Sequence, residues 1–284
     1  MFLAYLRVIF AFLALLFVAF GVAVLVYFWE HHVKPSRAAR ARIAELEKSN
    51  PERVDLGAKV FEQALVKLRM SDFEGAYPHL AEIMASYPDS DRYRAAKRII
   101  GEHNLDRLLS NDAMAGKEEY IVQSGDSLSR IASRTKTTMQ YIVQINNLLG
   151  TTLRKGEQLI ICPLDFSLSI DLSDKTLQVL SGEKFFKEYD ILGHRFPPRT
   201  GSDFDSSIAA KEAYDENGKG VAFGTDNYVT TSKYLRLEKR GVVIRSASPE
   251  EMKNEFTTGI FMRNADVEEL NTILCNGSKV LVRK

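Results

Sequence analysis

Residues 118–163 read EEYIVQSGDSLSRIASRTKTTMQYIVQINNLLGTTLRKGEQLIICP, and this stretch decides the fold of the middle of the chain. Its opening residues 120–122 alternate in polarity as a short strand does, and Gly125 predicts a turn after them. Asp126 or Ser127 then stands where a helix N-cap is expected, because either side chain can accept a hydrogen bond from a free backbone N–H group.

The second half of the stretch repeats this logic and closes the unit. Thr138 is placed to cap a second helix, whose apolar residues recur over 141–145 at helical spacing. Gly156 then marks a turn into a last strand over 158–161, with its apolar side chains on one face. The predicted order is strand, helix, helix, strand.

This order closely resembles a LysM module, which we place at residues 118–164. The positions that match the family are Tyr120, Val122, Gly125, Asp126, Ser127, Leu128, Ile131, Ala132, Ile142, Asn146, Leu148, Leu153, Gly156, Gln158, Leu159 and Ile161. The resemblance implies binding of an N-acetylglucosamine-containing glycan such as peptidoglycan. In the family this ligand lies in a shallow groove between two loops, which correspond here to residues 125–128 and 147–152.

The resemblance therefore gives a set of expected glycan-binding residues from the two loops. They are Gly125, Asp126, Ser127, Leu128, Asn147, Leu148, Leu149 and Gly150. Backbone groups of the loops would bond the acetamide, while Leu128 and Leu148 would offer apolar contact. Because so shallow a site buries little surface, we expect a single module to bind weakly and to depend on avidity.

The sequence becomes β-like after the module. Residues 167–192 read SLSIDLSDKTLQVLSGEKFFKEYDIL, with turn signals between alternating runs. Further strands are predicted at 234–237, 242–245 and 280–282, and a helix at 264–274 with its first residue as N-cap.

This C-terminal part resembles an L,D-transpeptidase domain of the YkuD type, which we place at residues 166–284. The block FPPRTGSDF at 196–204 and the run GIFMRNADVEELNTILCNGSKVLV at 259–282 carry the resemblance. Family enzymes use a cysteine nucleophile, which is activated by a histidine and assisted by an arginine. The cysteine forms an acyl-enzyme with a peptidoglycan stem peptide.

The residues expected for that chemistry are missing from this chain. The cysteine position falls on Gly259, or on Ile260 in an alternative register, the arginine position on Phe261 and the histidine position on Arg245. Glycine and isoleucine carry no nucleophile, and arginine stays protonated. We therefore predict that this domain is degenerate and has no catalytic residues. We expect it to serve binding or scaffolding, and a protein is a candidate partner.

An active L,D-transpeptidase is the alternative. The domain has one cysteine, Cys275, and one histidine, His194, and a relocated pair would require both to meet in one cleft. Together with Cys162, Cys275 fits either a reduced pair or one optional disulfide bridge.

Two segments precede the module. Val8–Trp29 is an uncharged apolar run within a predicted transmembrane anchor over 1–30, long enough to cross a bilayer core of about 30 Å. Residues 36–112 form a predicted helical spacer, in which 64–90 resemble one tetratricopeptide-type helix pair. We interpret this spacer as a stalk rather than a peptide-binding groove.

Composition sets the remaining limits. The chain has 284 residues, which fits a multidomain α+β protein, and its net charge of +1 gives no reason to expect a nucleic-acid partner. We predict no cofactor and no metal. The domains imply a single-pass protein of the bacterial inner membrane with its C-terminal domains outside. The basic residues Lys34, Arg37, Arg40 and Arg42 after the anchor predict the opposite orientation, with the protein as a cytoplasmic scaffold.

Overall fold

A computed structural model describes residues 55–111, 114–198, 200–239, 241–253 and 257–284. The predicted anchor, the basic residues that follow it and the first part of the spacer lie outside these ranges. Among the described residues, no helix combines the length and the apolar character needed to cross a membrane. Residues 56–284 form one compact unit.

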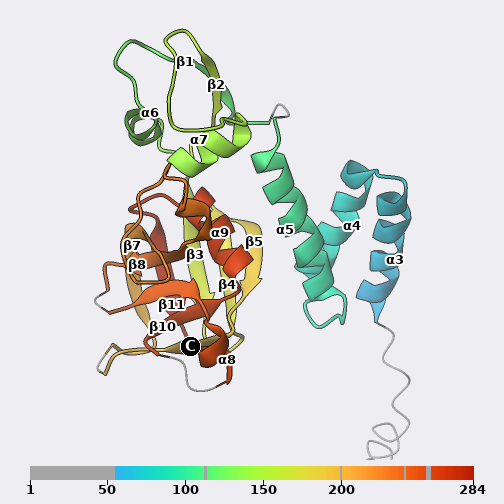
Figure 1. Cartoon of the computed structure of the whole chain (residues 1–284). Helices are drawn as coiled ribbons and strands as arrows, with labels where there is room; N and C mark the ends of the chain where they lie inside the picture. Colours follow the sequence, from blue (N-terminus) through green and yellow to red (C-terminus); the bar gives the residue numbers. More distant parts are fainter. Residues whose placement is uncertain (1–54, 112–113, 199, 240, 254–256) are drawn as a thin grey trace, which may run out of the picture. The chain divides into compact units, whose positions relative to one another are not determined.

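The described part of the spacer consists of three helices (Figure 1). They are α3 (Leu56–Arg69), α4 (Phe73–Ser86) and α5 (Tyr93–Leu109). The α3–α4 turn uses Ser71 with φ +59°, and the side chain of Asp72 caps α4 by accepting from the Gly75 N–H at 2.8 Å. Pro78 lies inside α4. It lies past the first turn of this 14-residue helix, so the helix lacks the hydrogen bond that an N–H group at this position would make to the residue four places earlier.

Helix α5 is packed onto the C-terminal sheet and is not a free stalk. Gly101 allows close approach, since a Cβ atom there would stand 3.0 Å from the Lys187 side chain. Asn104 donates to the Phe186 carbonyl at 2.8 Å, and Leu105 and Leu108 belong to the main core of the C-terminal domain. The spacer therefore shares its buried surface with the domain that it was expected to hold at a distance.

The LysM-like module has the predicted order. Its elements are β1 (Glu118–Ile121), α6 (Leu128–Arg134), α7 (Met139–Ile145) and β2 (Gln158–Ile161), with β1 antiparallel to β2. Ser127 and Thr138 cap the two helices by accepting from the N–H groups of Arg130 and Tyr141. Of the two expected capping residues for the first helix, Ser127 is therefore the one used.

Asn146 joins the second helix to the second strand. Its side-chain amide donates to the carbonyls of Ile142 and Ile160 at 2.9 and 2.8 Å, and its carbonyl accepts from the Ile160 N–H at 2.6 Å. These bonds satisfy both backbone groups of Ile160, which β1 does not reach on that side. The loop that follows, with Asn147 at φ +51°, is thereby held at its first residue.

Within the described residues, the C-terminal domain is built on one curled sheet of nine strands in the order β5-β4-β3-β11-β7-β8-β9-β10-β6 (Figure 1). The strands are β3 (Phe166–Asp171), β4 (Thr176–Ser181), β5 (Lys184–Asp190), β6 (Gly193–Arg195), β7 (Phe204–Tyr214), β8 (Ser232–Leu237), β9 (Val243–Ser246), β10 (Gly259–Met262) and β11 (Lys279–Arg283). Pairs β3–β11 and β9–β10 are parallel, and the others are antiparallel. The three later strands predicted from the sequence all form.

Helix α9 (Asn264–Ile273) packs against β8, β9 and α7. Its N-cap is Arg263 rather than Asn264, and no side chain caps it by a hydrogen bond. Arg263 instead pairs with Asp266 in the first turn at 2.8 Å, where a carboxylate favours the positive helix end. A short helix α8 (Pro249–Lys253) and a 3₁₀ turn η2 (Tyr228–Thr230) complete the domain.

We predict that Asn146→Ala lowers the free energy of unfolding of the full chain by about 1–2 kcal/mol, because it leaves the partly buried backbone groups of Ile160 without partners. Urea denaturation measures this. Gln144→Ala, an exposed change in the last turn of the same helix, is the matched control and should be near neutral. Equal losses from both variants would contradict the role given to Asn146.

Candidate functional site

The first predicted glycan loop is held in place by internal hydrogen bonds. Gly125 has φ +85°, as the turn requires. The carboxylate of Asp126 accepts from the Tyr120 hydroxyl at 2.7 Å and from the Gln123 N–H at 2.8 Å, and it pairs with Arg134 at 3.2 Å. Asp126 is thus a positioning residue within the loop, and its carboxylate has little capacity left for a ligand.

Other residues of this loop differ in how accessible they are. Gly125 and Ser127 are exposed, while the Gly125 carbonyl already accepts from the Arg130 guanidinium. The Leu128 side chain is only 3% exposed and packs in the module's core. The expected apolar contact of Leu128 with a glycan is therefore limited by its burial.

The second predicted loop is the open one. Asn147, Leu149 and Gly150 are exposed, and Leu149 is a fully exposed leucine at the loop tip. Leu148 is partly buried against the module's core. An exposed apolar side chain beside free backbone groups can contact the apolar face of a sugar and bond its polar groups.

The position that the transpeptidase resemblance gives to the nucleophile cannot accept a side chain as it stands. Gly259 has φ +146°, and a Cβ atom there would lie 2.9 Å from the Val243 carbonyl oxygen, which belongs to the neighbouring strand. A side chain would require the backbone of β9 or β10 to move. The conformation and the close packing of this strand therefore require glycine at position 259.

The other two positions of that resemblance form a structural cluster. Phe261 is fully buried, and the Arg245 guanidinium lies 4.5 Å from the centre of its ring. Arg245 makes a two-pronged ion pair with Glu251, one bond of which is 2.9 Å long, and also donates to the Thr257 hydroxyl. Both positions are committed to packing and charge pairing.

The carboxylate of Glu251 is stabilised in its charged form. Burial alone raises the pKa of Glu251, but hydrogen bonds from Arg245, Thr257 and the Ser248 N–H outweigh it and hold the pKa at about 2. The cluster is therefore ionised over the whole physiological range.

Cys275 and His194 are not brought together. Cys275 lies just before β11 and faces Lys211 and Asp165, whereas His194 lies on the edge strand β6 and faces Lys175 and Lys284. Lys284 directly follows β11, whereas Cys275 precedes it. Cys275 and His194 are therefore near opposite ends of β11, a strand of roughly 17 Å. Burial raises the pKa of the Cys275 thiol, and both cysteines are free.

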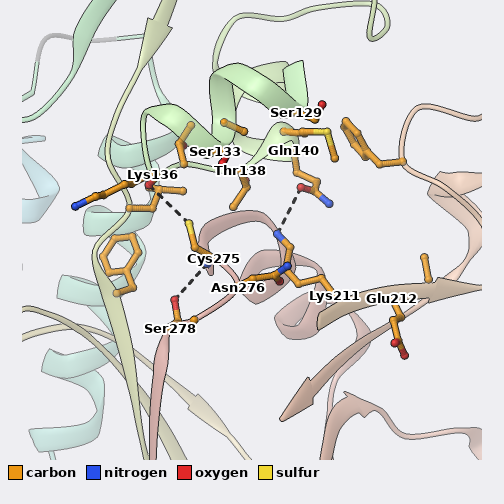
Figure 2. Close-up of a pocket in the computed structure, with 18 of the residues that line it drawn as sticks. Ser129, Ser133, Lys136, Thr138, Gln140, Lys211, Glu212, Cys275, Asn276 and Ser278 are labelled. Carbon is orange, nitrogen blue, oxygen red and sulfur yellow. Dashed lines mark hydrogen bonds between the residues drawn. The ribbon is translucent and has the colours of Figure 1, made fainter. Parts of the chain in front are cut away.

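A cavity of about 1140 Å³ lies between the LysM-like module and the C-terminal domain, and sequence analysis did not anticipate it. Figure 2 shows Ser129, Ser133, Lys136, Thr138 and Gln140 lining it from the module, opposite Lys211, Glu212, Cys275, Asn276 and Ser278. The two sets of residues come from distant parts of the sequence, and none belongs to a motif that points to a shared site.

Polar groups in the cavity wall are incompletely paired. The Lys211 amine donates to the Asn271 carbonyl at 2.6 Å and lies 3.5 Å from the Gln140 side-chain oxygen. The buried Thr137 hydroxyl has no hydrogen-bond partner within the described ranges. Among those residues, no group of three or more His, Cys, Asp or Glu side chains is arranged to hold a metal ion.

We predict that Glu251→Gln lowers stability by about 1–3 kcal/mol at pH 7, because it breaks the pairing with Arg245. Since the folded-state pKa of Glu251 is depressed from 4.5 to about 2, its contribution is present above pH 4.5 and is lost as pH falls toward 2. The difference between wild type and variant in thermal unfolding should therefore shrink over that interval. Glu250→Gln, on an exposed neighbour, is the control, and a difference that stays constant down to pH 2 would refute the assignment.

Comparison with solved structures finds similarity to L,D-transpeptidases. A Yku-type enzyme from Stackebrandtia nassauensis is 13% identical, with 42% of this chain and 56% of that chain covered and a TM-score of 0.32. An enzyme from Mycobacterium smegmatis is 14% identical, with 45% and 64% covered and a TM-score of 0.32. An enzyme from Enterococcus faecium is 17% identical, with 47% and 56% covered and a TM-score of 0.29.

The chain thus spans less than two thirds of the length of these three proteins. With identity and TM-scores this low, the similarity says nothing about the chemistry of this chain. No curated protein matches the sequence. One family does match a defined part of it: residues 120–161, which carry both predicted glycan loops, match the LysM domain.

Proposed function

We propose that this chain is a cell-envelope protein that binds peptidoglycan through its LysM module. The match of residues 120–161 to the LysM domain carries the proposal, because a LysM domain implies binding of peptidoglycan glycan. The exposed second loop supports it. Leu149 and the neighbouring backbone of Gly150 are open to a ligand, and Asn146 fixes the start of the loop. A loop that is held in place before binding loses less entropy when the glycan arrives.

The proposed location is the outer side of a bacterial cytoplasmic membrane. The uncharged run Val8–Trp29 supports a single-pass anchor, and the polymer that the module would bind lies outside that membrane. The basic residues after the run argue for the reverse orientation, and we weigh the ligand of the module above them. Anchoring would also supply the avidity that one shallow site lacks.

The proposed role of the C-terminal domain is binding or scaffolding, not catalysis. The backbone at Gly259 leaves no room for a nucleophile, and Phe261 and Arg245 are occupied in a packed ion-pair cluster. Cys275 and His194 face different charged neighbours, which disfavours a relocated catalytic pair. The domain also packs against α5 and α7, so it gives the module a fixed support.

We predict that Leu149→Ser raises the apparent dissociation constant for purified peptidoglycan by about fivefold, because one leucine loses its contact with the sugar. Co-sedimentation of the full chain, in detergent micelles, with peptidoglycan measures this. Val66→Ser, at an exposed apolar residue of α3, is the matched control and should bind as wild type does. Absence of wild-type sedimentation would refute the proposed function. Equal effects of the two changes would refute the assigned loop.

We predict that neither wild type nor Gly259→Cys forms a covalent adduct with a carbapenem, because burial raises the pKa of the Cys275 thiol and position 259 cannot present a thiol without backbone movement. Mass spectrometry of the intact chain measures this. Acylated wild-type protein would favour an active L,D-transpeptidase instead. Loss of that adduct in Cys275→Ala would then identify the nucleophile.

A further inference from the structure

The buried lysines of the described residues follow a consistent rule. Each of three buried lysines pairs with a glutamate: Lys97 with Glu188, Lys187 with Glu102 and Glu269 at 2.7 and 2.8 Å, and Lys233 with Glu268 at 2.9 Å. Such pairing offsets the cost of removing an ammonium group from water.

Lys211 departs from this rule. It extends from β7, is half-buried as a residue, and its amine lies deep enough that burial lowers the pKa of Lys211 to about 8. Its acceptors are the neutral Asn271 carbonyl and Gln140 side-chain oxygen. Among the described residues, no carboxylate pairs with it. An ammonium group has three donors, so one remains for a further partner.

The acidic residues near Lys211 do not serve as its partner. Glu212, the next residue on the strand, pairs with Arg236 at 3.0 Å and accepts from the Tyr214 hydroxyl. Asp165 also lines the cavity, but its side chain is exposed and it forms no ion pair with Lys211 among the described residues. No carboxylate of the described residues therefore serves as a counter-charge for Lys211, and a ligand could supply one.

The place for such a partner is the cavity that Lys211 lines. Its volume of about 1140 Å³ equals or exceeds that of common small-molecule pockets, so it has room for a short peptide. Lys136 and Lys279 line the same space and add positive charge, and Phe223 and Tyr228 add aromatic surface. In Figure 2 the Lys211 amine is joined by a dashed line to Gln140 across the boundary between the two domains.

We propose that this cavity binds a carboxylate-bearing ligand, either a peptide with a free C-terminus or a small organic acid, whose carboxylate pairs with the Lys211 ammonium group. The site does not depend on the glycan loops. Its walls include α7 of the module and β7 of the C-terminal domain, so a bound ligand would contact both. A Cβ atom at Gly224 would stand 2.4 Å from Thr151, which shows that the second glycan loop also touches this domain.

Binding should depend on pH in a defined direction. The ammonium form of Lys211 is required, so affinity should fall as pH rises through about 8, and a bound carboxylate should raise the pKa of Lys211. Cys275 is the titratable neighbour that acts on the pKa of Lys211, and it raises that pKa. Lys136, Lys279, Asp165 and Glu212 are the other charged residues that line the cavity.

The test is isothermal calorimetry on the full chain in detergent micelles with three probes: N-acetyl-alanyl-alanine, its C-terminal amide, and acetate. We expect the free dipeptide to bind about tenfold or more tightly than the amide, because a charge-assisted hydrogen bond is lost. Acetate binding as tightly as the dipeptide would assign the site to small acids, and weaker acetate binding would assign it to peptides.

Lys211→Met should abolish the preference for the free carboxylate, and Lys279→Met, an exposed lysine of the same cavity, should keep it. Lys211→Met should fold with equal or higher thermal stability, because it removes a buried charge without a counter-charge. If it does not fold, NMR of isotope-labelled lysine in the wild type decides instead: the resonance that titrates near pH 8 must shift to higher pH with the dipeptide.

Equal binding of dipeptide and amide by the wild type would overturn the proposal, as would a carboxylate preference that survives in Lys211→Met or a titration that the dipeptide leaves unchanged. Peptidoglycan sedimentation of Lys211→Met should match wild type, which separates this site from the glycan loops.

Discussion

The structure depends on the burial of α7 from two sides. Ile142 packs into the small core of the LysM module, while Tyr141 and Ile145 pack into the main core of the C-terminal domain. All three side chains are fully buried, and the Tyr141 hydroxyl donates to the Leu108 carbonyl at the end of α5. One helix of seven residues therefore joins the module, the spacer and the sheet. A short helix in water is unstable, so its tertiary contacts stabilise it and fix its orientation at once.

Buried ion pairs complete this arrangement. Lys97 and Lys187 hold α5 to the sheet, and Lys187 and Lys233 hold α9 to it. Pairs of this kind give orientation more than stability, since desolvation offsets much of the attraction. They also make Lys211 stand out. It is only partly buried, it lines an open space between two domains, and its acceptors among the described residues are neutral.

In the C-terminal domain, the positions where a transpeptidase resemblance would require reactive groups lie on strands. Their residues are engaged in packing and ion-pair contacts. Gly259 brings β10 close to β9, and the arginine at position 245 binds a carboxylate and an aromatic face. The Arg245–Glu251 pair also links α8 to β9. If the glycan loops bind as proposed, the domain's contribution would be to hold the module through α7 and the contact between Thr151 and Gly224.

The sequence by itself determined the elements whose signals are local. The module's order, the caps at Ser127 and Thr138 and the strands after position 166 follow from turn residues, polar caps and alternating side chains, which act within a few residues. It also identified Gly259, Phe261 and Arg245 as positions without a nucleophile or base, although not their geometry. Tertiary structure alone decided what distant segments do together. The packing of α5 on the sheet, the Arg245–Glu251 pair and the cavity around Lys211 join residues that no local pattern relates. A buried charge shows its missing partner only when every neighbouring element is in place, because burial is a property of the fold and not of the residue.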